Sequence, residues 1–149
     1  MKVYVACMAV VLLGVALVGC GGAGTPTWTR ARLARYPEAH LAYPGATLVG
    51  ETGGEGGHSI DGPFPASAGG VYGTADDRAA VEAFYARALT TRGWLSVPTG
   101  SGSTEVAAAT WRQGAVTFRL GFYRHQAPQV PPELDRFTTA FSAVLLAIP

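Results

Sequence analysis

The sequence contains no asparagine, and lysine, methionine and cysteine are almost absent. The few that occur are Met1, Lys2, Cys7, Met8 and Cys20, all within the first twenty residues. Chemistry that depends on a lysine amine, such as Schiff-base formation or a Ser-Lys dyad, is therefore excluded from the rest of the chain. A disulfide framework is excluded there as well, so the fold must depend on its hydrophobic core.

An excess of either charge is also missing. Beyond residue 20 the chain has ten arginines against ten aspartates and glutamates. Nucleic-acid-binding domains usually carry a basic surface, so this balance predicts no nucleic-acid partner. The one Gly-x-Gly-x-x-Gly string, residues 19–24, has no strand before it and no helix after it, and does not indicate a dinucleotide site.

The N-terminus has the order of a secretory signal. Lys2 is followed by the apolar run from Val3 to Val18 and then by small residues before Cys20. This run is shorter than the about 20 apolar residues of a membrane span, and a Gly-rich segment rather than a charged one follows it. We expect residues 1–19 to be a signal peptide. A transmembrane anchor and an ordinary signal cut at another site are the alternatives.

The four residues Leu17-Val18-Gly19-Cys20 resemble the lipobox of bacterial lipoproteins. In that family the cysteine sulfur receives a diacylglyceryl group and the chain is cut just before the cysteine. The resemblance implies that Cys20 is the lipid-bearing N-terminus of an extracytoplasmic protein anchored to the bacterial cell membrane. The Gly-rich residues 20–27 are then a flexible tether, and residues 28–149 form a single globular domain.

Turn and helix signals open the domain. We expect a short helix over residues 28–36, ended by the proline that follows. Tyr43-Pro44-Gly45-Ala46 favours a type II turn that leads into a strand over residues 46–50. Residues 51–70 are rich in glycine and proline and lack apolar periodicity, which predicts a long surface loop. Val71 and Tyr72 then re-enter the sheet.

The clearest element is a helix over residues 76–92. Thr74 or Asp76 is expected to cap its start, and Gly93 to follow its last turn. The polar residues of this helix are expected to face mainly solvent, among them Arg78, Glu82, Arg87 and Arg92. Apolar residues recur at helical spacing and predict one buried stripe, made of Val81, Phe84, Tyr85, Ala88 and Leu89.

The second half of the chain has the pattern of short strands. Runs over residues 94–97 and 105–112 precede the strongest one, residues 115–124, in which apolar and other residues alternate. Residues 137–146 fit either a helix or a strand, and we favour a strand because it would form a hairpin with the run before it. The predicted fold class is α+β, with one main amphipathic helix packed on an antiparallel β-sheet.

Two of these patterns also resemble a loosely defined class of small secreted actinobacterial-type lipoproteins of unknown function. The class places Tyr-Pro-Gly-Ala before the first strand and Val-x-x-Phe-Tyr-x-x-x-Leu-x-x-x-Gly-Trp across the main helix. The matching residues are Tyr43 to Ala46, then Val81, Phe84, Tyr85, Leu89, Gly93 and Trp94. The resemblance bears on fold and cellular location and implies no activity.

The most metal-like cluster is Glu55, His58 and Asp61, at steps of three residues in a Gly-rich segment. A metal site needs three or four ligands held in fixed geometry. A solvated loop is the simpler interpretation of residues 53–61, and an envelope enzyme or metal-binding factor that uses these three side chains is the alternative.

Catalytic patterns are scarce in the rest of the chain. His40, His58 and His125 lie in turn-rich segments, and no serine stands in a Gly-x-Ser-x-Gly elbow. The acidic pairs at residues 76–77 and 133–135 are better explained by helix or loop ends than by glycoside cleavage. We therefore expect no enzyme activity and no cofactor.

Binding is the function class that the sequence leaves open. Trp28, Tyr36 and Tyr43 cluster near the start of the domain, and residues 125–132 form a loop with three prolines. Such features on a rigid scaffold can bind a protein or an envelope polymer. The alternative is that the aromatic residues are core and the loop is merely stiff. The sequence predicts a non-catalytic, membrane-tethered binding domain, expected to be monomeric, whose ligand it does not identify.

Overall fold

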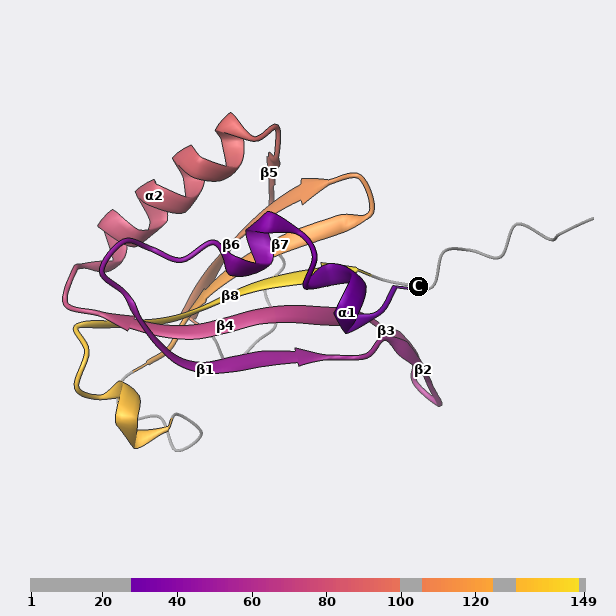
Figure 1. Ribbon diagram of the computed structural model, residues 1–149, viewed down its shortest axis with the longest axis horizontal. Helices are drawn as coiled ribbons and strands as arrows, with labels where there is room; N and C mark the ends of the chain where they lie inside the picture. Colours follow the sequence, from indigo (N-terminus) through magenta and orange to yellow (C-terminus); the bar gives the residue numbers. More distant parts are fainter. Residues whose placement is uncertain (1–27, 100–105, 125–130, 148–149) are drawn as a thin grey trace, which may run out of the picture.

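The computed structural model describes residues 28–99, 106–124 and 131–147 (Figure 1). Strands dominate this part of the chain. The strands are β1 (Thr47–Gly54), β2 (Gly57–Ser59), β3 (Gly62–Phe64), β4 (Ala66–Thr74), β5 (Leu95–Val97), β6 (Val106–Gln113), β7 (Val116–Phe122) and β8 (Thr139–Ala147). The helices are α1 (Arg30–Leu33) and α2 (Arg78–Thr91), with two 3₁₀ turns, η1 (Pro37–His40) and η2 (Pro132–Leu134).

Six strands form one sheet in the order β1-β4-β8-β7-β6-β5, and every neighbouring pair is antiparallel. Strands β2 and β3 form a separate hairpin. The architecture is broadly α+β, as predicted, with one main helix. The prediction of a strand at the C-terminus is also confirmed, because β8 pairs with β4 along its whole length and with β7 over residues 141–147.

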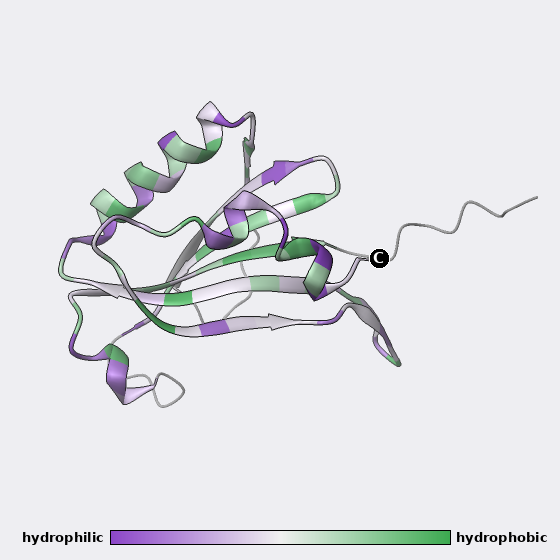
Figure 2. Cartoon of the chain, viewed as in Figure 1, coloured by the Kyte–Doolittle hydropathy of each residue, from purple (hydrophilic) through white to green (hydrophobic). Residues whose placement is uncertain are grey.

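The core lies between the sheet and the helices that cover one of its faces (Figure 1). The buried ring of Tyr85 on α2 lies 5.5 Å from the ring of Phe118 on β7 and 6.0 Å from that of Phe141 on β8. Leu33 of α1 is fully buried in the same cluster. Figure 2 shows hydrophobic residues along β8, and hydrophilic and hydrophobic residues alternating along α2. Burial of these apolar side chains is the main stabilising contribution to the fold.

The first turn and the first helix follow their sequence signals. The Ala46 N–H donates to the Tyr43 carbonyl at 3.0 Å, and Gly45 has φ of 80°. A positive φ of this kind is the conformation that a type II turn requires of its third residue. Helix α1 is shorter than predicted, and its start is capped by Thr29, whose hydroxyl accepts from the Arg32 N–H at 3.1 Å.

The residue that caps the start of helix α2 is neither of the two that the sequence predicted. The cap is Asp77, whose carboxylate accepts from the Ala80 N–H at 2.8 Å, so the prediction of Thr74 or Asp76 was wrong. Thr74 instead accepts from the Asp76 N–H at 3.2 Å and shapes the turn before the helix. The predicted role of Gly93 is confirmed by its φ of 81°, the left-handed conformation favoured after a helix.

The buried stripe of α2 is narrower than the sequence predicted. Val81, Tyr85 and Leu89 are fully buried, whereas Phe84 and Ala88 are only partly buried. The three buried residues recur every four positions and lie on the line closest to the sheet. Phe84 lies beside that line, where its ring meets the ring of Tyr43 at 5.4 Å.

The predicted surface loop over residues 51–70 was wrong. Strand β1 runs to Gly54, the β2–β3 hairpin follows, and β4 begins at Ala66. The glycines occur here because neighbouring backbone segments pack closely, not because the chain forms a loop. A Cβ on Gly53 would lie 2.6 Å from the Ser67 carbonyl oxygen, and one on Gly56 would lie 2.7 Å from the Ala66 nitrogen. A side chain at either position would clash with backbone.

Within the described residues, the helices are all too short or too polar to cross a membrane.

Candidate functional site

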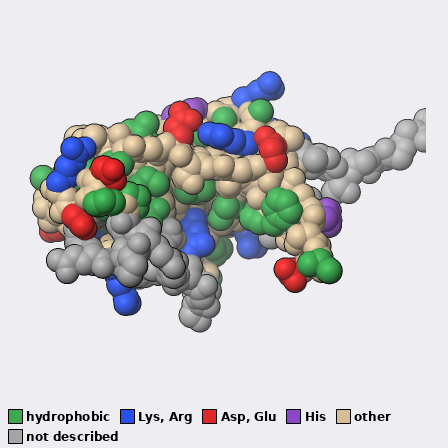
Figure 3. All heavy atoms as spheres, turned by 90° about the horizontal axis from the view of Figure 1, so that it is seen from below, with side chains coloured by type: hydrophobic (Ala, Val, Ile, Leu, Met, Phe, Trp, Pro, Cys, Tyr) green, Lys and Arg blue, Asp and Glu red, His purple; other side chains and the backbone are tan. Residues whose placement is uncertain are grey.

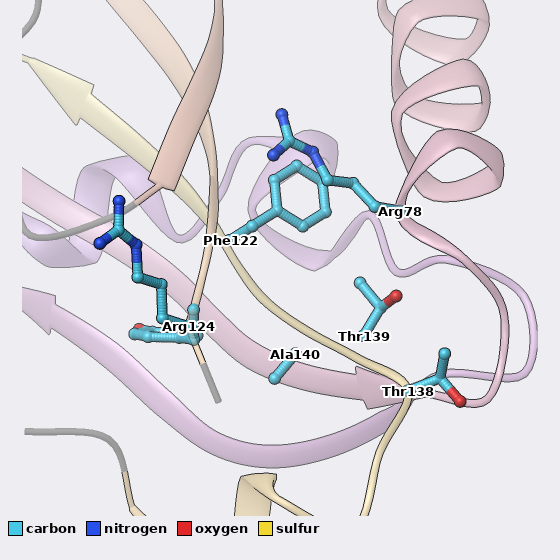
Figure 4. Close-up of a pocket in the computed structure, with 7 residues that line it drawn as sticks. Arg78, Phe122, Arg124, Thr138, Thr139 and Ala140 are labelled. Carbon is cyan, nitrogen blue, oxygen red and sulfur yellow. The ribbon is translucent and has the colours of Figure 1, made fainter. Parts of the chain in front are cut away.

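A hollow of about 450 Å³ opens at the end of the sheet where α2 begins, β7 ends and β8 begins (Figure 4). Three segments that are distant in the sequence supply its walls, because antiparallel pairing of β7 with β8 brings their ends beside the start of α2. The lining residues are Arg78, Phe122, Tyr123, Arg124, Thr138, Thr139 and Ala140.

Arg78 forms one side of the hollow. It is the first residue of α2, and its guanidinium lies 4.7 Å from the centre of the Phe122 ring. The Glu82 carboxylate, one turn further along the helix, lies 2.7 Å from the same guanidinium. The ring and the carboxylate together hold the arginine in place, and such a cation–π contact adds about 0.5–1 kcal/mol at an exposed site. Arg78 is therefore a positioned cation whose charge is partly balanced.

Arg124 forms the opposite side. It follows Phe122 by two residues, and side chains two apart along an extended strand point to the same face. The backbone at this point remains paired, since the Tyr123 N–H donates to the Ala140 carbonyl at 3.0 Å. Arg124 is exposed, and none of the carboxylates in the described part of the chain forms an ion pair with it. Figure 4 shows the Arg78 side chain reaching over the Phe122 ring from the start of α2, with Arg124 standing to the other side of Phe122.

The floor of the hollow is polar as well as aromatic. Thr138 is exposed and Thr139 is buried, and their hydroxyls can both donate and accept hydrogen bonds. The described residues that line the hollow include no histidine, cysteine or carboxylate. The arrangement therefore offers two cationic groups, hydroxyl donors and an aromatic face, which is a set that binds a carboxylate or a phosphate group.

A second, smaller hollow of about 200 Å³ lies between α1, η1 and the strands β1 and β4. Its polar residues are Arg30, His40, Glu51 and Tyr72, among others. Arg30 and Glu51 form an exposed ion pair at 3.3 Å, and the His40 Nε2 lies 2.8 Å from the Ala34 carbonyl oxygen. Burial raises the pKa of the Tyr72 hydroxyl, and the nearby Glu51 carboxylate raises it further. Arg30, Glu51 and His40 therefore already have ion-pair or hydrogen-bond partners within the fold.

The three residues considered as an alternative metal cluster are not brought together. Glu55, His58 and Asp61 all lie in the described chain, which holds no group of three or more histidine, cysteine or acidic side chains placed to bind a metal ion. The Glu55 carboxylate instead accepts a hydrogen bond from the Arg30 backbone N–H at 3.1 Å. His58 and Asp61 are exposed on the β2–β3 hairpin. In the described part of the chain these three side chains therefore do not form a metal-binding group.

The predicted aromatic cluster is mostly structural. Trp28 is buried in the core, with the Arg32 guanidinium 4.2 Å above its ring and the Tyr36 ring 6.3 Å away. Tyr43 packs on Phe84. The interpretation of these rings as core is confirmed for Trp28, while Tyr36 and Tyr43 are partly exposed.

Several predicted features fall on other parts of the chain. Cys20, His125 and most of the proline-rich loop, residues 125–130, lie outside the described residues. The acidic pairs take the roles of element ends that the sequence predicted. Asp77 caps α2, and Glu133 lies within η2 with Asp135 directly after it.

The hollow at the start of α2 was missed by the sequence reasoning, which assigned Arg78 to solvent. One signal was present. In the alternating strand over residues 116–124, Arg124 continues the series Val116, Phe118, Leu120 and Phe122, so it stands at the end of the core-facing row. A charge at the end of an apolar row marks the point where the core opens to water.

Comparison with known proteins provided no relative: the chain matches no family model, no curated protein and no solved structure.

Proposed function

We propose that the protein is a lipid-anchored extracytoplasmic domain that binds a ligand carrying a carboxylate or phosphate group, in the hollow between Arg78 and Arg124. Its N-terminal residues would hold it at the bacterial cell membrane through Cys20. The bound group would belong to an envelope polymer, a partner protein or a small molecule.

The observation that carries this proposal is the unpaired cation. Arg124 extends beside an open hollow without a carboxylate partner in the described chain, while Arg78 is fixed across from it by Phe122 and Glu82. An anion between the two guanidinium groups would accept charge-assisted hydrogen bonds, which are stronger than neutral ones. The Thr139 hydroxyl adds a further donor at the floor.

The same lining supports binding over catalysis. General acid–base and nucleophilic chemistry depend on histidine, cysteine, carboxylate or activated hydroxyl groups placed beside a base. The described lining offers the hydroxyls of Tyr123, Thr138 and Thr139, with no histidine, cysteine or carboxylate among the lining residues to act as their base.

The test is a titration of the mature, detergent-solubilised protein with inorganic phosphate and with acetate. Arginine side-chain N–H signals would be followed by NMR in protein labelled at arginine. We expect saturable shifts in the signals of Arg78 and Arg124, which are assigned by their loss in Arg78→Ala and Arg124→Ala. The phosphate shifts of Arg78 should weaken at least threefold in Arg124→Ala.

Arg87 provides the matched control, because it is an exposed arginine on α2 that does not line this hollow. Its signal should shift no more with phosphate than with chloride at the same ionic strength. Equal, non-saturating shifts of all exposed arginines would contradict the proposed site, because they would show only general attraction of anions.

A further inference from the structure

The β2–β3 hairpin carries two of the four exposed large hydrophobic side chains in the described part of the chain. Ile60 at its turn is fully exposed, and Phe64 at the end of β3 is 44% exposed. Pro63 between them is also exposed. Exposed apolar side chains that lie close together on one projecting element often mark an interaction surface.

The turn of this hairpin is held in one shape. The Ser59 hydroxyl accepts from the Asp61 N–H at 3.3 Å and donates to the Gly62 carbonyl at 3.2 Å. Gly62 has φ of 117°, a conformation that other residues rarely adopt. The Phe64 ring lies across Gly57 on the opposite strand, where a Cβ would come within 2.8 Å of it. These contacts fix the conformation of the turn, and Ile60 lies exposed at its tip.

The hairpin is also tied to the start of the domain. The Glu55 carboxylate, two residues before β2, accepts from the Arg30 N–H at the first residue of α1. The hairpin and α1 lie at the same end of the molecule in Figure 1. Figure 3 shows hydrophobic side chains standing out at this end, next to an acidic and a histidine side chain.

Chain length places this end close to the expected anchor. Eight residue steps separate Cys20 from Trp28, the first described residue, and they span at most about 29 Å at about 3.6 Å per residue. The five steps from Glu55 to Ile60 cover at most about 17 Å at about 3.4 Å per residue. A lipid on Cys20 and the tip of the hairpin can therefore reach the same membrane surface at once.

We propose that the β2–β3 hairpin docks on the lipid bilayer, with Ile60 and Phe64 entering its interfacial layer. This inference depends on the proposed lipid anchor. Apolar side chains gain free energy by leaving water for the acyl boundary, and an acyl anchor keeps them at high local concentration near it. The Asp61 carboxylate limits the depth to the headgroup region, because a charge in the hydrocarbon is costly. Arg32 and Arg35 are exposed at this end, as are Glu51 and Glu55, so the docking relies on the apolar side chains rather than on charge.

The experiment uses the full lipidated chain, reconstituted in vesicles of phosphatidylcholine and phosphatidylglycerol. Cys20 would be occupied by lipid, so one introduced cysteine gives a single labelled thiol. His58→Cys places an environment-sensitive fluorophore on the hairpin, and Ala86→Cys places it on an exposed position of α2 as the control. Headgroup-labelled nitroxide lipids then act as quenchers.

We expect at least threefold stronger lipid quenching at position 58 than at position 86. Adding Ile60→Ser and Phe64→Ser to the His58→Cys protein should reduce quenching to the level of the control. Quenching at position 58 that equals the control, or that the two serine substitutions leave unchanged, would overturn the docking. A blue shift at position 58 that depends on protein density and not on nitroxide lipid would also overturn it, in favour of contact with a second copy.

The mass of the same preparation separates this inference from the one on which it depends. A mature chain without acyl chains overturns both the anchor and the docking. An acylated chain with an unquenched hairpin overturns the docking alone. Near-UV circular dichroism of each variant should match that of the unsubstituted protein, because the changed side chains are exposed.

Discussion

The Tyr85 hydroxyl on α2 donates a hydrogen bond to the Leu41 carbonyl oxygen at 2.9 Å. The Tyr85 ring is fully buried, and Leu41 lies just after η1. This bond joins the main helix to the segment that precedes the first strand. It explains how a tyrosine can occupy the centre of the core, since a buried hydroxyl without a partner would be costly.

Tyr85→Phe should lower the free energy of unfolding at pH 7 by about 1 kcal/mol, because it keeps the ring and removes one hydrogen bond. Urea denaturation measures the difference. Tyr36→Phe is the matched control, because its partly exposed hydroxyl has no hydrogen bond among the described residues. It should change stability by less than about 0.5 kcal/mol.

The Tyr85→Phe variant also tests how stability depends on pH. Burial raises the pKa of Tyr85, so the unfolded chain loses this proton more readily than the folded one. Stability should be intact below about pH 10, where unfolded tyrosine titrates, and should fall as the pH rises above it. Tyr85→Phe should show a shallower alkaline decline than the unsubstituted protein. Parallel declines would mean that other groups cause the alkaline loss.

The buried line of α2 gives a graded prediction. Leu89→Ala should lower the free energy of unfolding by about 2–5 kcal/mol, because it opens a cavity at a fully buried position. Phe84→Ala should cost clearly less, about 1–3 kcal/mol, because this ring is partly exposed and its site can relax. Arg87→Ala should stay within about 0.5 kcal/mol. Thermal or denaturant melts that rank Phe84→Ala above Leu89→Ala would contradict the orientation of the helix.

Local signals predicted the elements that local chemistry determines. The alternation in β7, the glycine after α2 and the Pro-Gly turn before β1 each act within a few residues, and each is present in the structure. The glycines of residues 51–70 were misinterpreted because their cause is not local. Gly53 approaches the backbone of Ser67, and this contact exists only once β1 and β4 are paired.

The candidate site shows the same limit more strongly. Arg78 and Arg124 are separated by the rest of α2 and by β5, β6 and β7, and only the order of strands in the sheet places them around one hollow. The sequence instead offered Glu55, His58 and Asp61 as an alternative to a solvated loop, because they are near one another along the chain. Proximity in sequence was misleading there, because the Glu55 side chain is turned to the start of α1.

The anchor itself gives the last prediction, and it concerns Cys20. A thioether-linked diacylglyceryl group places two acyl chains in the bilayer at about 0.8 kcal/mol per buried methylene, whereas one chain gives only reversible binding. The equal numbers of acidic and basic residues beyond Cys20 give electrostatics no means of replacing that anchor. Cys20→Ala should abolish incorporation of labelled fatty acid and block cleavage by the lipoprotein signal peptidase, which leaves the uncleaved precursor or a form released by another peptidase. Cys7→Ala is the matched control and should leave labelling unchanged, because residue 7 is removed with the signal peptide. Fatty-acid labelling and N-terminal analysis of the unsubstituted protein decide the matter: a mature N-terminus other than Cys20, without acyl chains, would refute the anchor.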